Sequence, residues 1–418
     1  FWIFELFDTC VSVLIKTFER KANFLRVIER FREHGMPEKI AASRAKRIQD
    51  PNSNQMEDFN EKYNEKSSPK ISKLSIDKSL DSFTISTNIL VIEESAFSEC
   101  FSLKSICVDS NNSQFASIDG ILYTKNFETL LFFPPKHPFS NYTLPMSVTS
   151  IGNSAFSHCS NLQSINVDSN NSQFSSIDGI LFTKNCEKLL RFPIKHYLSS
   201  YIIPTMVTSI GHSAFYGCAN LQSITIPANV KSIDNSAFFN CSGLQSINVD
   251  DNNSQFASID GILFTKNFDT IVCFPGKHRL SSYAIPPSVT SICNSPFYGC
   301  SHLQSITIPT TVTTIDNSAF SGCCNLLSIN VDSSNSQFAS IDGILFTKNF
   351  ETIVCFPVKH HLSSYTIPTS VTSIGDSAFS GCQILRSIII PTSVTSIGKS
   401  AFSDCKNLQS IIIPTSVT

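Results

Sequence analysis

The chain has 418 residues, of which 15% are charged, and a formal net charge of −2 at pH 7. This balance predicts neither a nucleic-acid partner nor a strongly basic membrane-binding surface. Phenylalanine is frequent, with 34 residues, and serine, threonine, asparagine and isoleucine abound. A composition that is both polar and aromatic favours β-rich structure with hydroxyl-lined turns.

The N-terminal part differs from the rest of the chain. Residues 1–49 begin with an apolar stretch, Phe1–Ile15, that is too short and too charged to span a membrane and lacks the features of a signal peptide. The spacing of apolar residues in Lys16–His34 predicts an amphipathic helix. Residues 50–79 are polar and predict a linker. Because the chain begins without Met and stops within a repeat, we expect a fragment truncated at its C-terminus.

Residues 80–418 repeat one pattern, whose clearest copy is TSVTSIGDSAFSGCQILRSIIIP at Thr369–Pro391. The next copy, Thr392–Pro414, follows 23 residues later. A fixed period in this range predicts a solenoid, because one coil cannot bury its apolar face without a neighbour. The stretch Leu221–Pro227, LQSITIP, alternates apolar and polar residues. It therefore predicts a short strand that pairs in parallel with its neighbours.

Some coils carry an insertion. Copies of the Ser-Ala-Phe…Cys signature, with Pro296 replacing alanine in one, are separated by 23 or 59 residues, which differ by 36. Each 36-residue insertion contains an Asp-Gly pair, which signals a tight turn, and stretches such as GILFT and KLLRFP, which predict the arms of a β-hairpin. We expect the hairpins to project from, or widen, one face, which in repeat proteins is often the binding face. The four insertions lie at Val108–Pro145, Val167–Pro204, Val249–Pro286 and Val331–Pro368.

The chain has 15 cysteines. Cysteines at the same position of neighbouring coils are expected roughly 5 Å apart, so disulfides are geometrically possible. The preferred interpretation is a ladder of buried free thiols that pack as small apolar groups. The cysteine pattern is compatible with both an oxidising and a reducing compartment. The in-phase cysteines are Cys100, Cys159, Cys218, Cys241, Cys300, Cys323, Cys382 and Cys405.

Other recurring polar motifs have structural explanations. No cysteine or aspartate keeps metal-ligand spacing with the Lys-His pairs of the insertions, so these pairs are interpreted as turn residues. The Asp-Ser-Asn-Asn runs lack the glycine and closing glutamate of an EF-hand and predict Asx-turns. No nucleophile–base pair, phosphate loop or carboxylate pair stands out. We therefore predict no enzyme, no catalytic residue, no metal site, no cofactor and no small-molecule substrate.

The coil SVTSIGxSAFxxCxxLxSIxIP and the insertion VDxNNSQFxSIDGILFTKxxxxLLxFP together resemble the BspA-like leucine-rich repeat family, leucine-rich repeat type 5. The resemblance covers residues 80–418. It implies a right-handed leucine-rich-repeat array and a surface or secreted protein that adheres to host or matrix proteins. The family has no catalytic residues to carry over to this sequence.

The first functional hypothesis is a cell-surface or secreted adhesion module, in which weak contacts from near-identical hairpins add up to useful avidity. The second is a cytoplasmic scaffold whose helical N-terminus docks to another protein. No membrane anchor is visible in the sequence. Packing of the hairpin base is an alternative role for the candidate tyrosines. The candidate binding residues are Tyr142, Tyr201, Tyr283, Tyr365, Lys136, Lys195, Lys277 and Lys359, and the candidate glycosylation sites are Asn111, Asn170 and Asn252.

Overall fold

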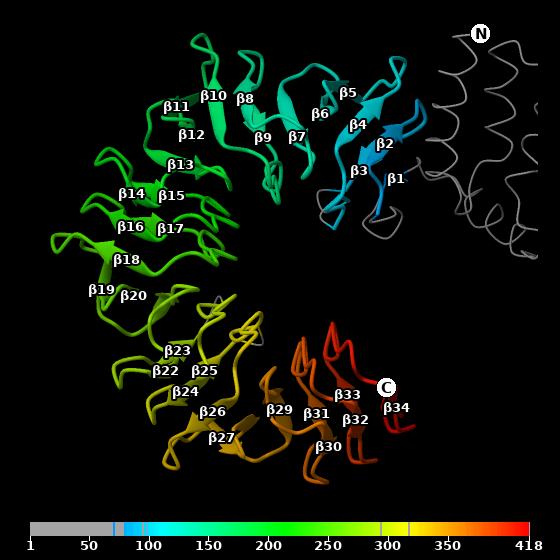
Figure 1. Cartoon of the computed structure of the whole chain (residues 1–418), viewed down its shortest axis with the longest axis vertical. Helices are drawn as coiled ribbons and strands as arrows, with labels where there is room; N and C mark the ends of the chain where they lie inside the picture. Colours follow the sequence, from blue (N-terminus) through cyan, green and yellow to red (C-terminus); the bar gives the residue numbers. More distant parts are fainter. Residues whose placement is uncertain are drawn as a thin grey trace, which may run out of the picture. The chain divides into compact units, whose positions relative to one another are not determined.

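The computed structural model describes residues 70–71, 79–93, 96–97, 99–292, 295–316 and 318–417. The predicted N-terminal helix and most of the predicted linker lie outside these residues. Within the described residues the secondary structure consists of strands and turns, without a helix. The chain divides into two compact units, Phe1–His137 and Pro138–Thr418, coloured along the sequence in Figure 1.

A short turn of the solenoid contains a first strand and a second strand. In one such turn these are β16 (Ser223–Ile226) and β17 (Ser232–Ile233). β16 pairs in parallel with β18 (Ser246–Val249), so that each residue lies opposite the residue 23 positions later. The isoleucines of β16 are buried while Ser223 and Thr225 are partly exposed. The prediction of stacked 23-residue coils with parallel strands is confirmed.

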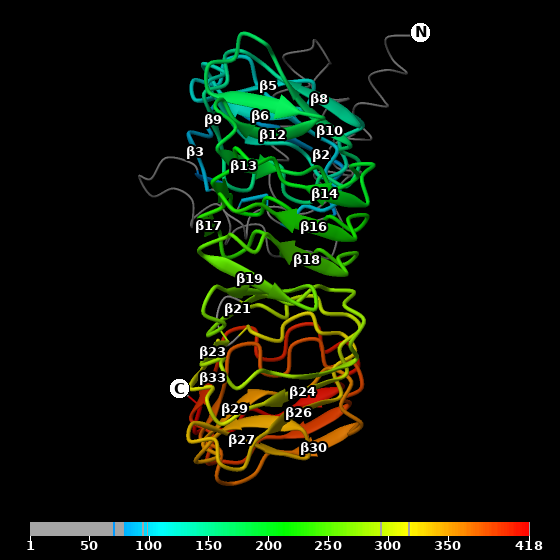
Figure 2. The ribbon, with the colours of Figure 1, turned by 90° about the vertical axis from the view of Figure 1, so that its left-hand side faces the viewer.

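The same arrangement recurs through both units. In Phe1–His137 the first strands are β2 (Ser82–Ile85) and β4 (Ser105–Val108), and the second strands are β1 (Lys70–Ile71), β3 (Val91–Ile92) and β7 (Thr129–Phe132). In Pro138–Thr418 the other first strands are β8 (Asn141–Leu144), β10 (Ser164–Val167), β14 (Ser200–Ile202), β22 (Ser282–Ala284), β24 (Ser305–Ile308), β26 (Ser328–Val331), β30 (Ser364–Thr366), β32 (Ser387–Ile389) and β34 (Ser410–Ile411). The other second strands there are β9 (Ser150–Ile151), β13 (Lys188–Arg191), β15 (Ser209–Ile210), β21 (Ile271–Cys273), β23 (Ser291–Ile292), β25 (Thr314–Ile315), β29 (Thr352–Cys355), β31 (Ser373–Ile374) and β33 (Ser396–Ile397). Figure 2 shows β14, β16 and β18 side by side.

Turns that begin at β4, β10, β18 and β26 are longer and are called the first, second, third and fourth long turns. Each contains an antiparallel strand pair that the short turns lack. These pairs are β5 (Phe115–Ile118) with β6 (Ile121–Thr124), β11 (Phe174–Ile177) with β12 (Ile180–Thr183), β19 (Phe256–Ile259) with β20 (Ile262–Thr265), and β27 (Phe338–Ile341) with β28 (Ile344–Thr347).

Strand pairing shows how a long turn joins the solenoid. In the second long turn β12 pairs antiparallel with β13, and β13 then pairs in parallel with β15 of the next turn. β14 in the same way continues the row of first strands by pairing with β16. The 36 residues from Ser164 to Ser199 therefore supply a complete turn with both of its strands. We expected a hairpin that projects from, or widens, one face of a 23-residue coil. The inserted residues instead form a turn of their own, whose strands pair with those of the neighbouring turns.

The core consists of columns of side chains that run from turn to turn. The rings of Phe215 and Phe238 stack with centroids 5.4 Å apart, and Phe192 of the second long turn lies 5.5 Å from Phe215. Two further columns repeat this arrangement. They are Phe274–Phe297–Phe320 and Phe356–Phe379–Phe402. Because each turn buries its aromatic residue against a neighbour, stability depends on stacking.

The described in-phase cysteines are free thiols, as the preferred interpretation predicts. All of them are buried except Cys405, which is partly exposed. The thiol of Cys241 donates to the carbonyl oxygen of Phe215 at 2.9 Å, and that of Cys323 to Phe297 at 3.0 Å. Burial raises the pKa of the Cys218 thiol to about 12. These thiols therefore act as small core residues with a weak donor.

Candidate binding surface on the long turns

An Asp-Gly turn joins the two extra strands of each long turn. In the third long turn Asp260 has φ 52° and Gly261 has φ 80°, the left-handed conformation that two-residue hairpin turns require. A Cβ atom on Gly261 would lie 2.7 Å from the Cβ atom of Ser246 in β18, so only glycine fits this close approach. The carbonyl oxygen of Gly261 accepts a hydrogen bond from the backbone N–H of Ile247 at 2.8 Å. The turn is thereby fixed against the first strand.

A buried asparagine anchors the start of the same hairpin. The Asn253 amide nitrogen donates to the carbonyl oxygens of Pro227 at 2.8 Å and Val230 at 3.0 Å, both in the preceding turn. Its amide oxygen accepts from the backbone N–H groups of Gln255 at 2.9 Å and Phe256 at 2.8 Å. Every side-chain polar group of this buried residue is therefore satisfied. The equivalent residues Asn112, Asn171 and Asn335 make the same four bonds.

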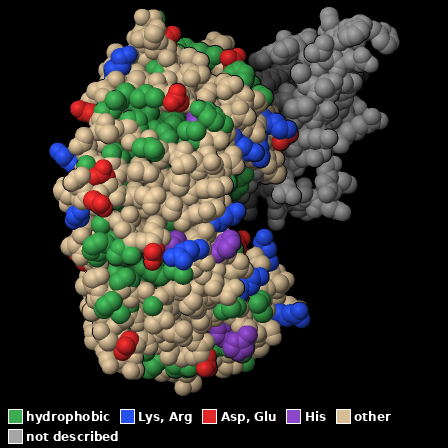
Figure 3. Space-filling view, turned by 60° about the vertical axis from the view of Figure 1, so that its left-hand side comes forward, with side chains coloured by type: hydrophobic (Ala, Val, Ile, Leu, Met, Phe, Trp, Pro, Cys, Tyr) green, Lys and Arg blue, Asp and Glu red, His purple; other side chains and the backbone are tan. Residues whose placement is uncertain are grey.

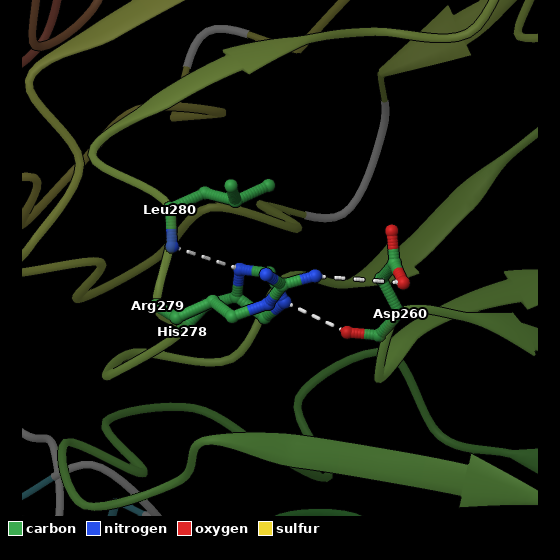
Figure 4. Close-up of polar contacts among 4 residues, drawn as sticks. All are labelled: Asp260, His278, Arg279 and Leu280. Carbon is green, nitrogen blue, oxygen red and sulfur yellow. Dashed lines mark hydrogen bonds and ion pairs between the residues drawn. The ribbon is translucent and has the colours of Figure 1, made fainter.

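The histidine of each Lys-His pair is buried beside the Asp-Gly turn. The His278 Nε2 atom lies 2.8 Å from the carbonyl oxygen of Asp260, and its Nδ1 atom lies 3.3 Å from the backbone nitrogen of Leu280 (Figure 4). Because the Leu280 N–H can only donate, Nδ1 accepts and Nε2 carries the proton that is donated to Asp260. The ring also packs 4.9 Å from Phe274. The bond to the aspartate carbonyl recurs at His137, His196 and His360.

This arrangement gives the histidines a structural role. Both ring nitrogens of His278 are used within the fold, and burial lowers the pKa of His360. Within the part of the chain that the structure describes, no group of three or more His, Cys, Asp or Glu side chains could hold a metal ion. The Asp-Ser-Asn-Asn runs form the predicted Asx-turns, as the Asn170 N–H shows by donating to the Asp168 carboxylate at 2.9 Å.

The lysines of the Lys-His pairs lie at the surface. The side chains of Lys136, Lys195 and Lys277 are exposed, and Lys359 is partly exposed. Each backbone N–H donates to a leucine carbonyl of the preceding turn, for example that of Lys277 to Leu244 at 2.7 Å. The backbone of this loop is thus fixed while the ammonium groups reach solvent.

The candidate tyrosines lie inside the solenoid. Tyr142, Tyr201 and Tyr283 are buried and Tyr365 is partly buried. Tyr283 occupies an inward position of β22, and its ring lies 5.0 Å from that of Phe274. These rings pack against the phenylalanine columns, which favours the alternative role of packing over direct contact with a partner. Burial raises the pKa of Tyr365 to about 12.

A position that the sequence interpretation missed is the residue directly after each Lys-His pair. It is exposed in every long turn and differs among them, as Pro138, Tyr197, Arg279 and His361. Tyr197 is 77% exposed, and its ring stacks on His196 with centroids 4.6 Å apart. The guanidinium of Arg279 lies 3.7 Å from the Asp260 carboxylate (Figure 4). In the sequence this position could have been found by its variation, since it differs among four segments that are otherwise closely repeated.

Most of the surrounding surface is uncharged. Figure 3 shows one face on which polar uncharged side chains and backbone dominate, with scattered charges and small hydrophobic patches. The candidate glycosylation residues Asn111, Asn170 and Asn252 are exposed. Along the described residues, no helix has the length and apolar character needed to cross a membrane.

Comparison with known proteins identifies the family. The sequence matches the family described as BspA type leucine rich repeat region, with six copies, over residues 67–130, 131–196, 192–273, 270–355 and 352–418. A search of curated proteins finds no match.

Several solved structures are similar to the chain. One is a leucine rich cell surface protein from Faecalibacterium prausnitzii A2-165, with 27% identity, coverage of 79% of this chain and 78% of that chain, and a TM-score of 0.43. A leucine-rich repeat protein from Eubacterium ventriosum ATCC 27560 has 19% identity, coverage of 80% and 87%, and a TM-score of 0.43. The pneumococcal vaccine antigen PcpA has 18% identity, coverage of 72% and 68%, and a TM-score of 0.34. With a family match that spans most of its length and a solenoid of 23-residue turns, the chain belongs to the BspA-type leucine-rich repeat family.

Proposed function

We propose that the chain is a non-enzymatic protein-binding module that acts at the cell surface or after secretion and adheres to host or matrix proteins through its long turns. The observation that carries this proposal is the exposed position after each Lys-His pair. Four similar frameworks present four different side chains there, those of Pro138, Tyr197, Arg279 and His361. The implied adhesive role of BspA-like proteins supports the same function.

Rigid presentation favours binding by these residues. In the third long turn the lysine backbone bond and the buried histidine fix the loop before the variable position, and the bond from the Leu280 N–H to His278 Nδ1 fixes it after that position. A side chain on a fixed base loses less conformational entropy when it binds a partner. Tyr197 and Arg279 are also residue types that often dominate interface energetics.

Repetition favours avidity. Lys136, Lys195, Lys277 and Lys359 place positive charge beside each variable residue. Contacts that are weak at one long turn add up when several engage the same partner or matrix. The tyrosines contribute indirectly, because Tyr201 and Tyr283 pack against phenylalanine rings that in turn contact the buried histidines of the loops.

The test combines location and binding. An antibody against residues 164–200 should label intact, unpermeabilised cells of the native organism. The triple variant Tyr197→Ala, Arg279→Ala, His361→Ala should bind a matrix extract at least tenfold more weakly with an unchanged thermal midpoint. The matched control is Lys266→Ala with Lys348→Ala, two exposed lysines elsewhere on the long turns. Unlabelled cells, or equal binding by the triple variant and the control, would refute the proposal.

A second candidate function is a cytoplasmic scaffold, which the free thiols of the described cysteines favour. The exposed sequons separate the two functions. A glycan found at Asn170 or Asn252 of protein purified from the native organism excludes the scaffold.

A further inference from the structure

Each long turn is recessed on the side of the solenoid that carries the phenylalanine columns. In a short turn five positions separate the second-strand isoleucine from the column phenylalanine, as in Ile210 and Phe215. In the second long turn only three positions separate Leu189 from Phe192. The shorter loop leaves a notch between the fuller loops of the turns before and after it.

In the second long turn an arginine fills this notch. Arg191 is 5% exposed, and its guanidinium donates to the carbonyl oxygens of Ser213 at 2.5 Å and Tyr216 at 3.1 Å. Its guanidinium carbon also lies 5.9 Å from the centre of the Tyr216 ring. The Tyr216 hydroxyl bonds to His158 Nε2 at 3.0 Å, which joins the two loops that border the notch. Two backbone carbonyls and a ring therefore hold a buried guanidinium here.

The third long turn has a notch without an arginine. Cys273 occupies the position of Arg191, since each pairs with the equivalent leucine of the antiparallel strand. The notch is a small crevice that includes Cys273, Ser295 and Tyr298 in its lining. The rings of Phe239 and Tyr298 stack with centroids 4.8 Å apart. These two rings come from the turns before and after and form part of the crevice wall.

The fourth long turn has the same notch, but with neither the arginine nor the pair of stacked rings. Cys355 stands in the position of Arg191, and serines replace the two stacked rings at Ser321 and Ser380. The crevice is larger than that of the third long turn and is lined by these residues together with Ser377 and Asp316.

The two backbone carbonyl groups that bind Arg191 have equivalents in the notch of the fourth long turn. Ser377 and Ser380 occupy the positions of Ser213 and Tyr216. The two loops share a backbone hydrogen bond. The Ser380 N–H donates to the carbonyl oxygen of Ser377 at 2.9 Å, and the Tyr216 N–H donates to the carbonyl oxygen of Ser213 at 3.0 Å. Asp316 replaces Gly152 and adds a carboxylate to the lining.

We propose that the fourth notch binds a guanidinium group, which an arginine side chain of a partner protein supplies. The planar guanidinium matches two carbonyl acceptors with its fork of N–H donors, whereas an ammonium is a compact point charge. The carboxylate of Asp316 complements the positive charge. The choice of a protein as the source rests on the proposed function, but the guanidinium itself follows from the comparison with Arg191.

The first test uses methylguanidinium as the probe and the full chain as the protein. Titration followed by amide NMR should shift the resonances of residues 377–381 with a dissociation constant on the order of millimolar, a range typical of very small ligands. Methylammonium should bind at least tenfold more weakly. Equal binding of the two cations, or no shift with methylguanidinium, would overturn the proposal.

Two variants show whether the notch is the site. Cys355→Arg places the chain's own guanidinium in the notch, as at Arg191, and should abolish the shifts. Ser321→Phe with Ser380→Tyr closes the notch as in the third long turn and should have the same effect. Opening the third notch with Phe239→Ser and Tyr298→Ser should add a second set of shifts. Unchanged shifts in both closing variants would place the probe elsewhere and refute the site.

A final measurement separates this site from the proposed function. Both closing variants should reduce binding to the matrix extract at least threefold. If methylguanidinium binds in the notch but matrix binding is unchanged, the protein arginine is the wrong source. If methylguanidinium fails to bind while the triple variant of Tyr197, Arg279 and His361 still loses adhesion, the guanidinium site is wrong and the proposed function stands.

Discussion

The Nε2 atom of His278 lies 2.8 Å from the carbonyl oxygen of Asp260, a residue 18 positions earlier in the chain. This bond joins the late loop of the third long turn to its hairpin turn. The same separation and the same bond recur in the other long turns. A repeated internal bond of this kind gives the exposed residue beside it a fixed base, and its strength can be measured.

Replacement of His278 by alanine should lower the free energy of unfolding by about 2–4 kcal/mol, because two backbone groups lose their partner and the ring leaves a cavity. Urea unfolding followed by circular dichroism measures the change. The control is Lys277→Ala, which removes an exposed side chain and should cost at most about 0.5 kcal/mol. Similar losses in both variants would contradict a structural role for the histidine.

Neighbouring asparagines provide a second matched pair. Asn253 makes four hydrogen bonds and is fully buried, whereas Asn252 is exposed. Asn253→Ala should cost about 2–3 kcal/mol, because buried backbone groups of two turns lose their partners. Asn253→Asp should cost more, since a carboxylate would face two carbonyl oxygens. Asn252→Ala should stay within about 0.5 kcal/mol in the same urea experiment, and an equal effect would count against the anchor.

A substitution at Gly261 tests how closely the hairpin turn of the third long turn packs against β18. Gly261→Ala should destabilise the chain by about 2 kcal/mol or more, because φ is positive and the new Cβ meets Ser246. The double variant with Ser246→Gly removes the closest contact but keeps the backbone strain. It should recover part of the loss in thermal unfolding. Full recovery would assign the whole cost to the clash, and no recovery would assign it to backbone conformation.

Stability should fall in mild acid. Burial lowers the pKa of His360 and neighbouring His361 lowers it further, while the bond to Asp342 acts in the opposite direction. The folded state therefore binds a proton less readily than the unfolded state. The contribution of His360 to stability is fully present above the pKa of histidine in the unfolded chain, about 6.5. It is lost as the pH falls from that value through the lower pKa of the folded state.

The measurement is the urea midpoint between pH 7.5 and 5. The midpoint should decrease over this range, and His360→Gln should flatten part of the decrease, since glutamine can donate to Asp342 without titrating. An identical pH profile for the variant would show that other groups cause the loss.

Much of the fold was predictable because its information is local and repeated. The alternation in Ser223–Ile226 sets which side chains face inward, and the 23-residue spacing sets the register with Ser246–Val249. The inward position of Tyr283 was also present in this pattern. Tyr283 follows an exposed serine in β22, just as Ile224 follows Ser223 in β16. Its place in the strand required burial, which favours the packing role over the binding role among the two that the sequence offered.

By itself the sequence determined the period, the strands and the position of the 36-residue segments. Only the tertiary structure decided that such a segment is a full turn, because β13 and β15 pair although Lys188–Arg191 and Ser209–Ile210 share little sequence likeness. Stacking also decided which of the adjacent residues Asn252 and Asn253 is buried. In both cases the deciding hydrogen bonds run between neighbouring turns, so they depend on how the turns stack and not on the local alternation of apolar and polar residues.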